Sequence, residues 1–221
     1  MNKEEIFHYL AEQDVSILSE LLQIAYDQMD TNQRRAVFGN IAKKIPSTEV
    51  DGTELLDEIK DFYSDSLAGQ YYAPFEINSK NYSHIPEETE EWFETLGDFL
   101  TNSAKLTKQG NHQLAIDCFT VLYELIEHME NGEEIIFADE CGSWMIPADE
   151  KIFLKAFLTS LAALKNAKGF TEVALPLIRR DSFMSFANKV YAFATKVANK
   201  DQKAFLVEEV KRQNVRTKPN R

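Results

Sequence analysis

Apolar residues recur at helical spacing along almost the whole chain, and this periodicity limits the protein to an all-α fold. In stretch after stretch, apolar side chains lie three or four positions apart and polar residues fill the opposite face. The breaks between stretches carry residues that begin or end helices, such as Asp51, Pro86, Gly110 and Asp149. The periodic stretches between these breaks predict about nine helices. The alternation of apolar and polar residues that is typical of strands is not sustained anywhere in the sequence.

Most predicted connections are short, so neighbouring helices are expected to be antiparallel. The pattern favours a single domain, residues 1–221, built as a right-handed α-α superhelix or a stack of helical hairpins. Four helix boundaries or interruptions are specific predictions. Pro46 ends a third helix that begins at Asp30-Thr31, Gly169 and Pro176 end or interrupt helices, and Ser182 begins a helix that continues to Val197.

One connection, from Tyr71 to Ile85, is long and carries no helical period. Long loops are often functional or are packed on their own side chains. Its aromatic residues predict packing, since aromatic rings are mostly buried. The alternative is a binding role, for which the candidate residues are Tyr71, Tyr72 and Tyr82.

The segment 106–119 resembles the middle of a tetratricopeptide repeat, a helical hairpin with glycine at its turn. Gly110, Ala115 and Phe119 match that pattern, whereas Ser103 and Leu122 depart from it, and no second copy follows at a 34-residue period. The resemblance implies an α-hairpin and a peptide-binding groove. It transfers no binding residue.

Two further combinations, Phe62 to Tyr72 and Phe137 to Trp144, resemble those of uncharacterised bacterial helical proteins. This second resemblance implies no known activity.

The segment 135–146 is the least ordinary in the sequence. Apolar residues flank a polar tip that contains Gly142, a pattern that predicts a small β-hairpin. Asp139, Glu140 and Trp144 are candidates for holding a cation or presenting a ligand surface, although their spacing does not match a calcium loop. The alternative is structural: Trp144 anchors the loop in the core while the acidic residues cap helices.

Charge is distributed unevenly within the net −12. Residues 1–150 carry 9 Lys and Arg against 31 Asp and Glu, a net −22, whereas residues 151–221 carry 15 against 5, a net +10. Such asymmetry suggests either that the two parts attract each other within one fold or that they meet different partners. We expect them to meet around the loop that ends at Trp144.

Several classes of function are disfavoured by the sequence. No apolar run could cross a membrane, the N-terminus lacks a signal peptide's apolar core, and two cysteines make no disulfide framework, so a cytoplasmic protein is expected. His112, Cys118, His128 and Cys141 do not have the spacing of a zinc site. Since nucleophile elbows and phosphate-binding loops are also absent, we predict no enzymatic activity, cofactor or metal.

The favoured function is therefore that of a protein-interaction module whose partner is another protein or a peptide. An alternative is binding of nucleic acid or an acidic partner through the basic C-terminal third, including its tail 211–221. A carboxylate- or metal-dependent enzyme around Asp139, Glu140 and Asp149 is the third hypothesis.

Overall fold

The computed structural model is all-helical, which confirms the predicted fold class. It describes residues 2–29, 33–34, 36–38, 49–82, 84–137, 142–147, 149–180 and 189–217. Within these ranges there are nine α-helices with defined bounds, further helical residues at 33–34 and 36–38, one 3₁₀ turn and no strand. The chain divides into two compact units, residues 1–48 and residues 49–221, which are described separately. The predicted single domain and the handedness of the helical stack stay predictions.

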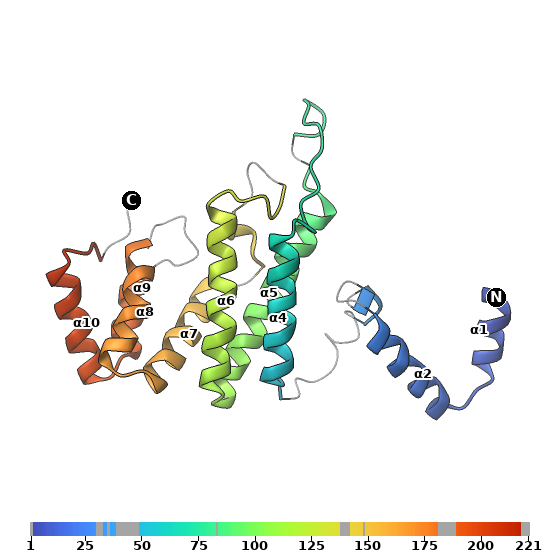
Figure 1. Cartoon of the computed structure of the whole chain (residues 1–221), viewed down its shortest axis with the longest axis horizontal. Coiled ribbons are helices and arrows are strands. Elements are labelled where there is room, and N and C mark those ends of the chain that lie inside the picture. The colour runs from blue at the N-terminus through green and yellow to red at the C-terminus, as the bar shows by residue number, and fades with distance from the viewer. Residues whose placement is uncertain are drawn as a thin grey trace. The chain divides into compact units, whose positions relative to one another are not determined.

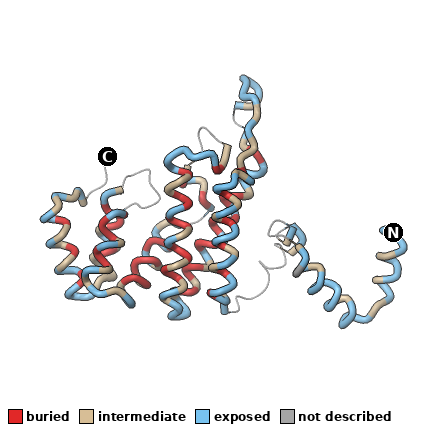
Figure 2. Tube along the Cα trace, viewed as in Figure 1, coloured by how far each residue is buried: buried red, intermediate tan, exposed pale blue. Residues whose placement is uncertain are grey.

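The first unit contains α1 (Lys3–Ala11) and α2 (Val15–Gln28). The Asn2 side chain caps α1 by accepting a hydrogen bond from the Glu4 backbone N–H at 3.1 Å. The two helices diverge from the turn between them, and neither contains a residue drawn as buried in Figure 2. Most of the predicted third helix, from Asp30 to Pro46, lies outside the described residues. The parts of it that are described, 33–34 and 36–38, are helical.

The second unit is built around three long helices: α4 (Gly52–Leu67), α5 (Glu87–Gln109) and α6 (His112–Glu130). They lie side by side in Figure 1 and enclose much of the buried apolar surface. Trp92 of α5 is fully buried, and its indole N–H donates at 2.9 Å to the hydroxyl of Ser66, close to the C-terminal end of α4. Because the polar edge of the ring has a partner, burying this large side chain costs little polar desolvation.

The turn between α5 and α6 has the predicted hairpin geometry. Gly110 has φ +83°, a left-handed conformation that favours glycine, and Asn111 N–H bonds back to Leu106 O at 3.0 Å. Ala115 and Phe119 are fully buried on α6. The α-hairpin implied by the tetratricopeptide resemblance is therefore present, while membership of that repeat family stays a prediction.

The remaining helices extend the unit beyond α6. They are α7 (Glu150–Leu164), α8 (Ala167–Arg180), α9 (Val190–Val197) and α10 (Lys200–Arg212). Phe157 on α7 packs against Phe119 and Tyr123 of α6, with ring centroids 5.5 and 5.4 Å apart. Gln202 of α10 is buried and donates to Ala162 O and Lys165 O, which ties α10 to the end of α7.

Two predicted helix boundaries are wrong. Gly169 lies inside α8, because Asn166 begins that helix by accepting from the Gly169 N–H at 2.8 Å. The helix also continues past Pro176 to Arg180, so this proline does not end it, while a kink at Pro176 stays a prediction. Pro176 and Glu172 both face solvent, so water can hydrate the carbonyl group that lacks an N–H partner.

The helix predicted to run unbroken from Ser182 to Val197 is also wrong at Lys189. This residue has φ +62°, in the left-handed region, and α9 starts only after it at Val190. The predicted start at Ser182 lies outside the described residues. Among the helices described here, none is both long and apolar enough to cross a membrane.

Candidate functional site

The segment that follows α6 crosses the end of the three-helix core, and its apolar residues hold it there. Ile135 and Ile146 are buried, and the Thr89 hydroxyl of α5 donates to Phe137 O at 3.3 Å. Pro147 lies against Gly97 of α5, where an added Cβ would be only 3.0 Å from its Cγ. Glycine in the middle of this helix therefore allows the segment to approach the α5 backbone closely.

The β-hairpin predicted over 135–146 is not present in the described part of that segment, 135–137 and 142–146. The Ile135 N–H bonds to Glu133 O at 2.7 Å, and the Ile146 N–H bonds to Ser143 O at 3.3 Å. Residues 143–145 form the 3₁₀ turn η1 (Ser143–Met145). The backbone N–H groups of Ile135 and Ile146 are bonded within local turns, and the two side chains are buried against helices. These groups are therefore not available for pairing between strands.

Trp144 points outward from η1, with 68% of its surface exposed. The predicted alternative, in which this indole anchors the loop in the core, is wrong. Ile146, two residues later and 5% exposed, is the anchor instead. The indole lies back over Gly142, where an added Cβ would be 3.2 Å from the ring. The candidates Asp139 and Glu140, together with Cys141, lie outside the described residues.

The long loop after α4 packs against the same end of the unit and extends beyond it in Figure 1. The Phe137 ring is in edge contact with Tyr72 and Phe75, at centroid distances of 5.8 and 5.1 Å. Tyr71 is 4% exposed and belongs to the core, with its ring 5.4 Å from Phe62. Tyr82 is 73% exposed. The loop and the segment after α6 therefore converge through Tyr72, as a shared site requires, whereas Tyr71 is structural.

A cavity of about 380 Å³ lies where the two segments meet. Its walls come from the end of α4, the following turn and the residues after α6. The lining residues are Leu67, Ala68, Gly69, Tyr72, Glu133, Glu134 and Ile135. An aromatic ring, aliphatic side chains and two carboxylates make this cavity suitable for a side chain that combines a positive charge with an apolar stem.

A polar cluster formed by Tyr63, Glu124, His128 and Glu133 stands beside the cavity. His128 Nδ1 is 2.7 Å from Glu133 Oε1, and the Tyr63 hydroxyl donates to Glu124 at 3.0 Å and lies 3.3 Å from His128 Nε2. Burial and the nearby carboxylates raise the pKa of Tyr63. The cluster fixes Glu133, which lines the cavity, through a network linking α4 and α6. Sequence reasoning missed it, although Glu124 and His128 have i, i+4 spacing.

The acidic and basic parts of the chain pack together along α5, α6 and α7, and one ion-pair contact between them lies close to the turn that carries Trp144. Arg180 of α8 pairs with Glu127 at 2.6 Å and with Glu130 at 3.8 Å. Glu130 also accepts a hydrogen bond from the Ser143 hydroxyl at 2.6 Å. One chain of contacts therefore runs from the basic third, through α6, to the residue before Trp144.

The described residues of the zinc-type set, His112, His128 and Cys118, have different surroundings and no shared neighbour in the contacts below. His112 Nδ1 lies 3.2 Å from the Ser160 hydroxyl, and His128 faces Glu133. Cys118 is buried, and this burial raises the pKa of its thiol to about 11. In the described ranges, no group of three His, Cys, Asp or Glu side chains could hold a metal ion.

Asp149, a residue of the enzyme hypothesis, caps α7 by accepting a hydrogen bond from the Lys151 N–H at 3.0 Å.

No protein-family model, curated protein or solved structure matches the chain.

Proposed function

We propose that the protein is an interaction module that binds a basic, partly apolar segment of another protein. The proposed site is the loop-bearing end of unit 49–221, where the loop after α4 (71–82) meets residues 133–137 and 142–146. The observation that carries this proposal is the exposure of Trp144 on a turn that is itself fixed by buried neighbours. Tryptophan is enriched among the residues that dominate binding energy at protein interfaces. A rigidly presented indole also loses little conformational freedom when a partner covers it.

Charge supports a basic partner. Residues 49–150 contain 4 Lys and Arg against 24 Asp and Glu. Glu133 and Glu134 line the cavity, and the first turn of α5 adds Glu87, Glu88 and Glu90. A field of one sign accelerates encounter with a partner of the opposite sign and excludes partners of like charge.

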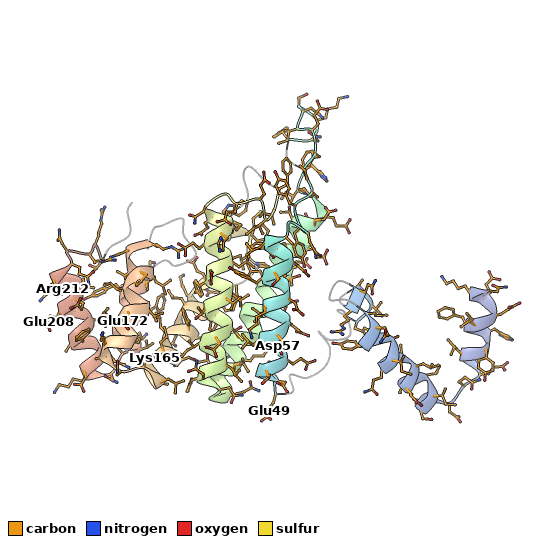
Figure 3. The ribbon with its side chains drawn as sticks, viewed as in Figure 1. Glu49, Asp57, Lys165, Glu172, Glu208 and Arg212 are labelled. Carbon is orange, nitrogen blue, oxygen red and sulfur yellow. The ribbon has the colours of Figure 1, made fainter. Side chains whose placement is uncertain are left out.

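Binding of nucleic acid by the basic third receives less support from the contacts. Arg180 pairs with Glu127, Arg212 with Glu209, and Lys168 with Glu172. Helices α8 and α10 carry acidic as well as basic side chains, among them Glu172, Glu208 and Arg212, which are labelled in Figure 3. A footprint for phosphates needs unpaired cations concentrated on one face. Passage through a heparin column at low salt is the result expected here.

The absence of catalysis, the absence of a cofactor and a cytoplasmic location stay predictions. The enzyme hypothesis centred on Asp139 and Glu140, which lie outside the described residues. We expect the protein to bind a peptide and to leave that peptide chemically unchanged, as an interaction module does.

The test is a fluorescence titration of the full chain with synthetic peptides of about 12 residues that alternate Lys or Arg with Leu or Phe. Trp92 is buried and Trp144 exposed, so a bound peptide should protect the accessible part of the tryptophan emission from acrylamide. Peptides with Glu in place of the basic residues are the matched probes. Binding of the basic set alone is expected.

Two variants assign the binding to this site. Trp144→Ala is expected to weaken binding, measured by peptide anisotropy, by roughly tenfold or more. Leu164→Ala, which shortens another half-exposed apolar side chain at the far end of α7, is expected to leave it unchanged. Failure of every basic peptide to bind, or equal binding by both variants, would contradict the proposed function.

A further inference from the structure

The N-terminal unit exposes apolar side chains on a scale that the rest of the described chain does not approach. Among described residues, nine of the fifteen exposed large apolar side chains belong to residues 1–48. They are Phe7, Tyr9, Val15, Ile17, Leu21, Leu22, Ile24, Tyr26 and Val37. Single exposed apolar residues are ordinary, but a concentration of them marks a surface that another surface covers.

The apolar face of α2 is too wide for one neighbouring helix. Successive residues of a helix are about 100° apart around its axis. Seen down this axis, the apolar residues of α2 cover an arc of about 200°, with Ile24 at one edge and Tyr26 at the other, which is roughly twice the apolar stripe of a typical surface helix. Leu18 and Ala25 lie near the centre of this arc and are half-buried. Leu22 and Val15 on one flank, and Ile24 on the other, are exposed. The unit thus covers the centre of the arc and leaves both flanks open.

Unit 1–48 is also too small to supply the missing cover. Chains of about 40 residues rarely bury enough apolar surface to fold alone without disulfides, metals or association. Among its described residues, the ring contacts are that of Arg34, 4.7 Å from the Tyr26 ring, and the edge contact of Tyr26 with Phe38, and both lie at the C-terminal end of α2. In α1, which carries exposed Phe7 and Tyr9, no residue is buried.

We propose that the α1–α2 surface is a dimerisation face that pairs with the same surface of a second copy of this chain. The surface that best matches a dense apolar face is another dense apolar face. In the described part of unit 49–221, the six exposed large apolar residues are divided between the loop-bearing end and α7. A two-fold pairing brings identical patches together and therefore matches apolar surface with apolar surface.

Charge and area are both compatible with this pairing. Glu20, the charged residue of α2 whose side chain is described, lies on the polar side of the helix, so pairing through the apolar arc does not bring it against its own copy. The eight exposed apolar side chains of α1 and α2, at exposed fractions between 36% and 78%, offer on the order of 700 Å² of surface per chain. That is close to the roughly 800 Å² per partner of a standard stable interface.

The proposal predicts that the full-length protein is a dimer in solution. Light scattering after size exclusion should give about twice the chain mass of 25.4 kDa at tens of micromolar. Sedimentation at falling concentration should show reversible dissociation. A monomer at every concentration up to about 100 μM would overturn the proposal.

Substitutions on opposite sides of α2 locate the interface. Val15→Glu with Leu22→Glu places charge on the apolar arc and should give a monomer. Ser16→Glu with Gln23→Glu adds the same charge to the polar side of the same helix and should leave the dimer intact. Leu21→Ala with Leu22→Ala introduces no charge and favours the helix, and it should weaken association by at least about 100-fold.

Circular dichroism checks that each variant keeps its helical content. A dimer that persists in both apolar-arc variants would assign association to another surface and would overturn the proposal. Equal dissociation of the polar-side control would do the same, because it would show a general effect of charge.

Discussion

Helices α2 and α5 are both amphipathic, yet their apolar faces have different environments. In α5, Trp92, Leu96 and Leu100 are fully buried against α4 and α6. In α2, whose described side chains include no buried one, Leu21, Leu22 and Ile24 remain exposed. The contrast teaches that periodicity determines which face of a helix is apolar, whereas covering that face depends on the neighbours that the chain, or a second chain, supplies.

The difference also assigns separate roles to the two units. Unit 49–221 has a core of its own and presents a fixed aromatic and acidic end, which we propose as the partner site. Unit 1–48 presents apolar helix faces, which we propose as the self-association site. Under these two proposals, unit 49–221 depends on its own packing for stability, and unit 1–48 depends on assembly.

The two tryptophans provide the largest contrast. Trp92→Ala should destabilise the protein by about 3–5 kcal/mol, because it leaves a cavity in the core and removes the partner of the Ser66 hydroxyl. Trp144→Ala should change stability by less than about 0.5 kcal/mol, as expected for an exposed position. Urea unfolding followed by circular dichroism measures both. Comparable losses would mean that Trp144 is packed after all.

Two leucines make the comparison between the units directly. Leu96→Ala is expected to cost about 2–5 kcal/mol at any protein concentration, since this side chain is fully buried within the chain. Leu22→Ala should cost less than about 1 kcal/mol in dilute solution and more as concentration rises, because its cover comes from a second copy. Unfolding at about 1 μM and 100 μM separates these effects.

Alkaline pH should weaken the core of unit 49–221. Burial raises the pKa of Cys118 from 9.0 to about 11, so the folded state holds its proton to higher pH than the unfolded state does. The resulting stability is present below pH 9 and is lost as pH rises towards 11, by roughly 2 kcal/mol. Cys118→Ala should show a shallower decline over this range. Equal slopes for both proteins would show that the thiol is not responsible.

The contact between acidic and basic parts should have the smallest effect. Arg180 and Glu127 are both partly exposed, so Arg180→Ala is expected to cost about 0.5–1 kcal/mol at low salt. The cost should shrink in about 0.5 M salt, since exposed pairs are screened. Glu172→Ala, which removes the more exposed pair with Lys168, is the control expected to cost less. A cost that is independent of salt would point to packing of the Arg180 stem instead.

Features governed by neighbouring residues could be predicted from the sequence. Asp51 and Asp149 cap their helices, Pro86 precedes α5, and Gly110 turns the central hairpin, because each depends on a few adjacent backbone groups.

Features governed by tertiary packing could not be predicted in this way. Trp144 and Ile146 are both apolar residues in one short segment, and only the position of α5 beneath it decides which one is buried. Pro176 is tolerated because its side of α8 faces water. The cavity at Tyr72 and Glu133 joins residues about 60 positions apart, and neither local sequence specifies the other.

Hydrogen exchange of the full-length protein at two concentrations tests the central claim most directly. The amides of α4, α5 and α6 should exchange slowly and at the same rate at about 1 μM and 100 μM, since their burial is internal. The amides of α1 and α2 should exchange quickly at the lower concentration and become protected at the higher one. Protection of α1 and α2 that is the same at both concentrations would contradict the account.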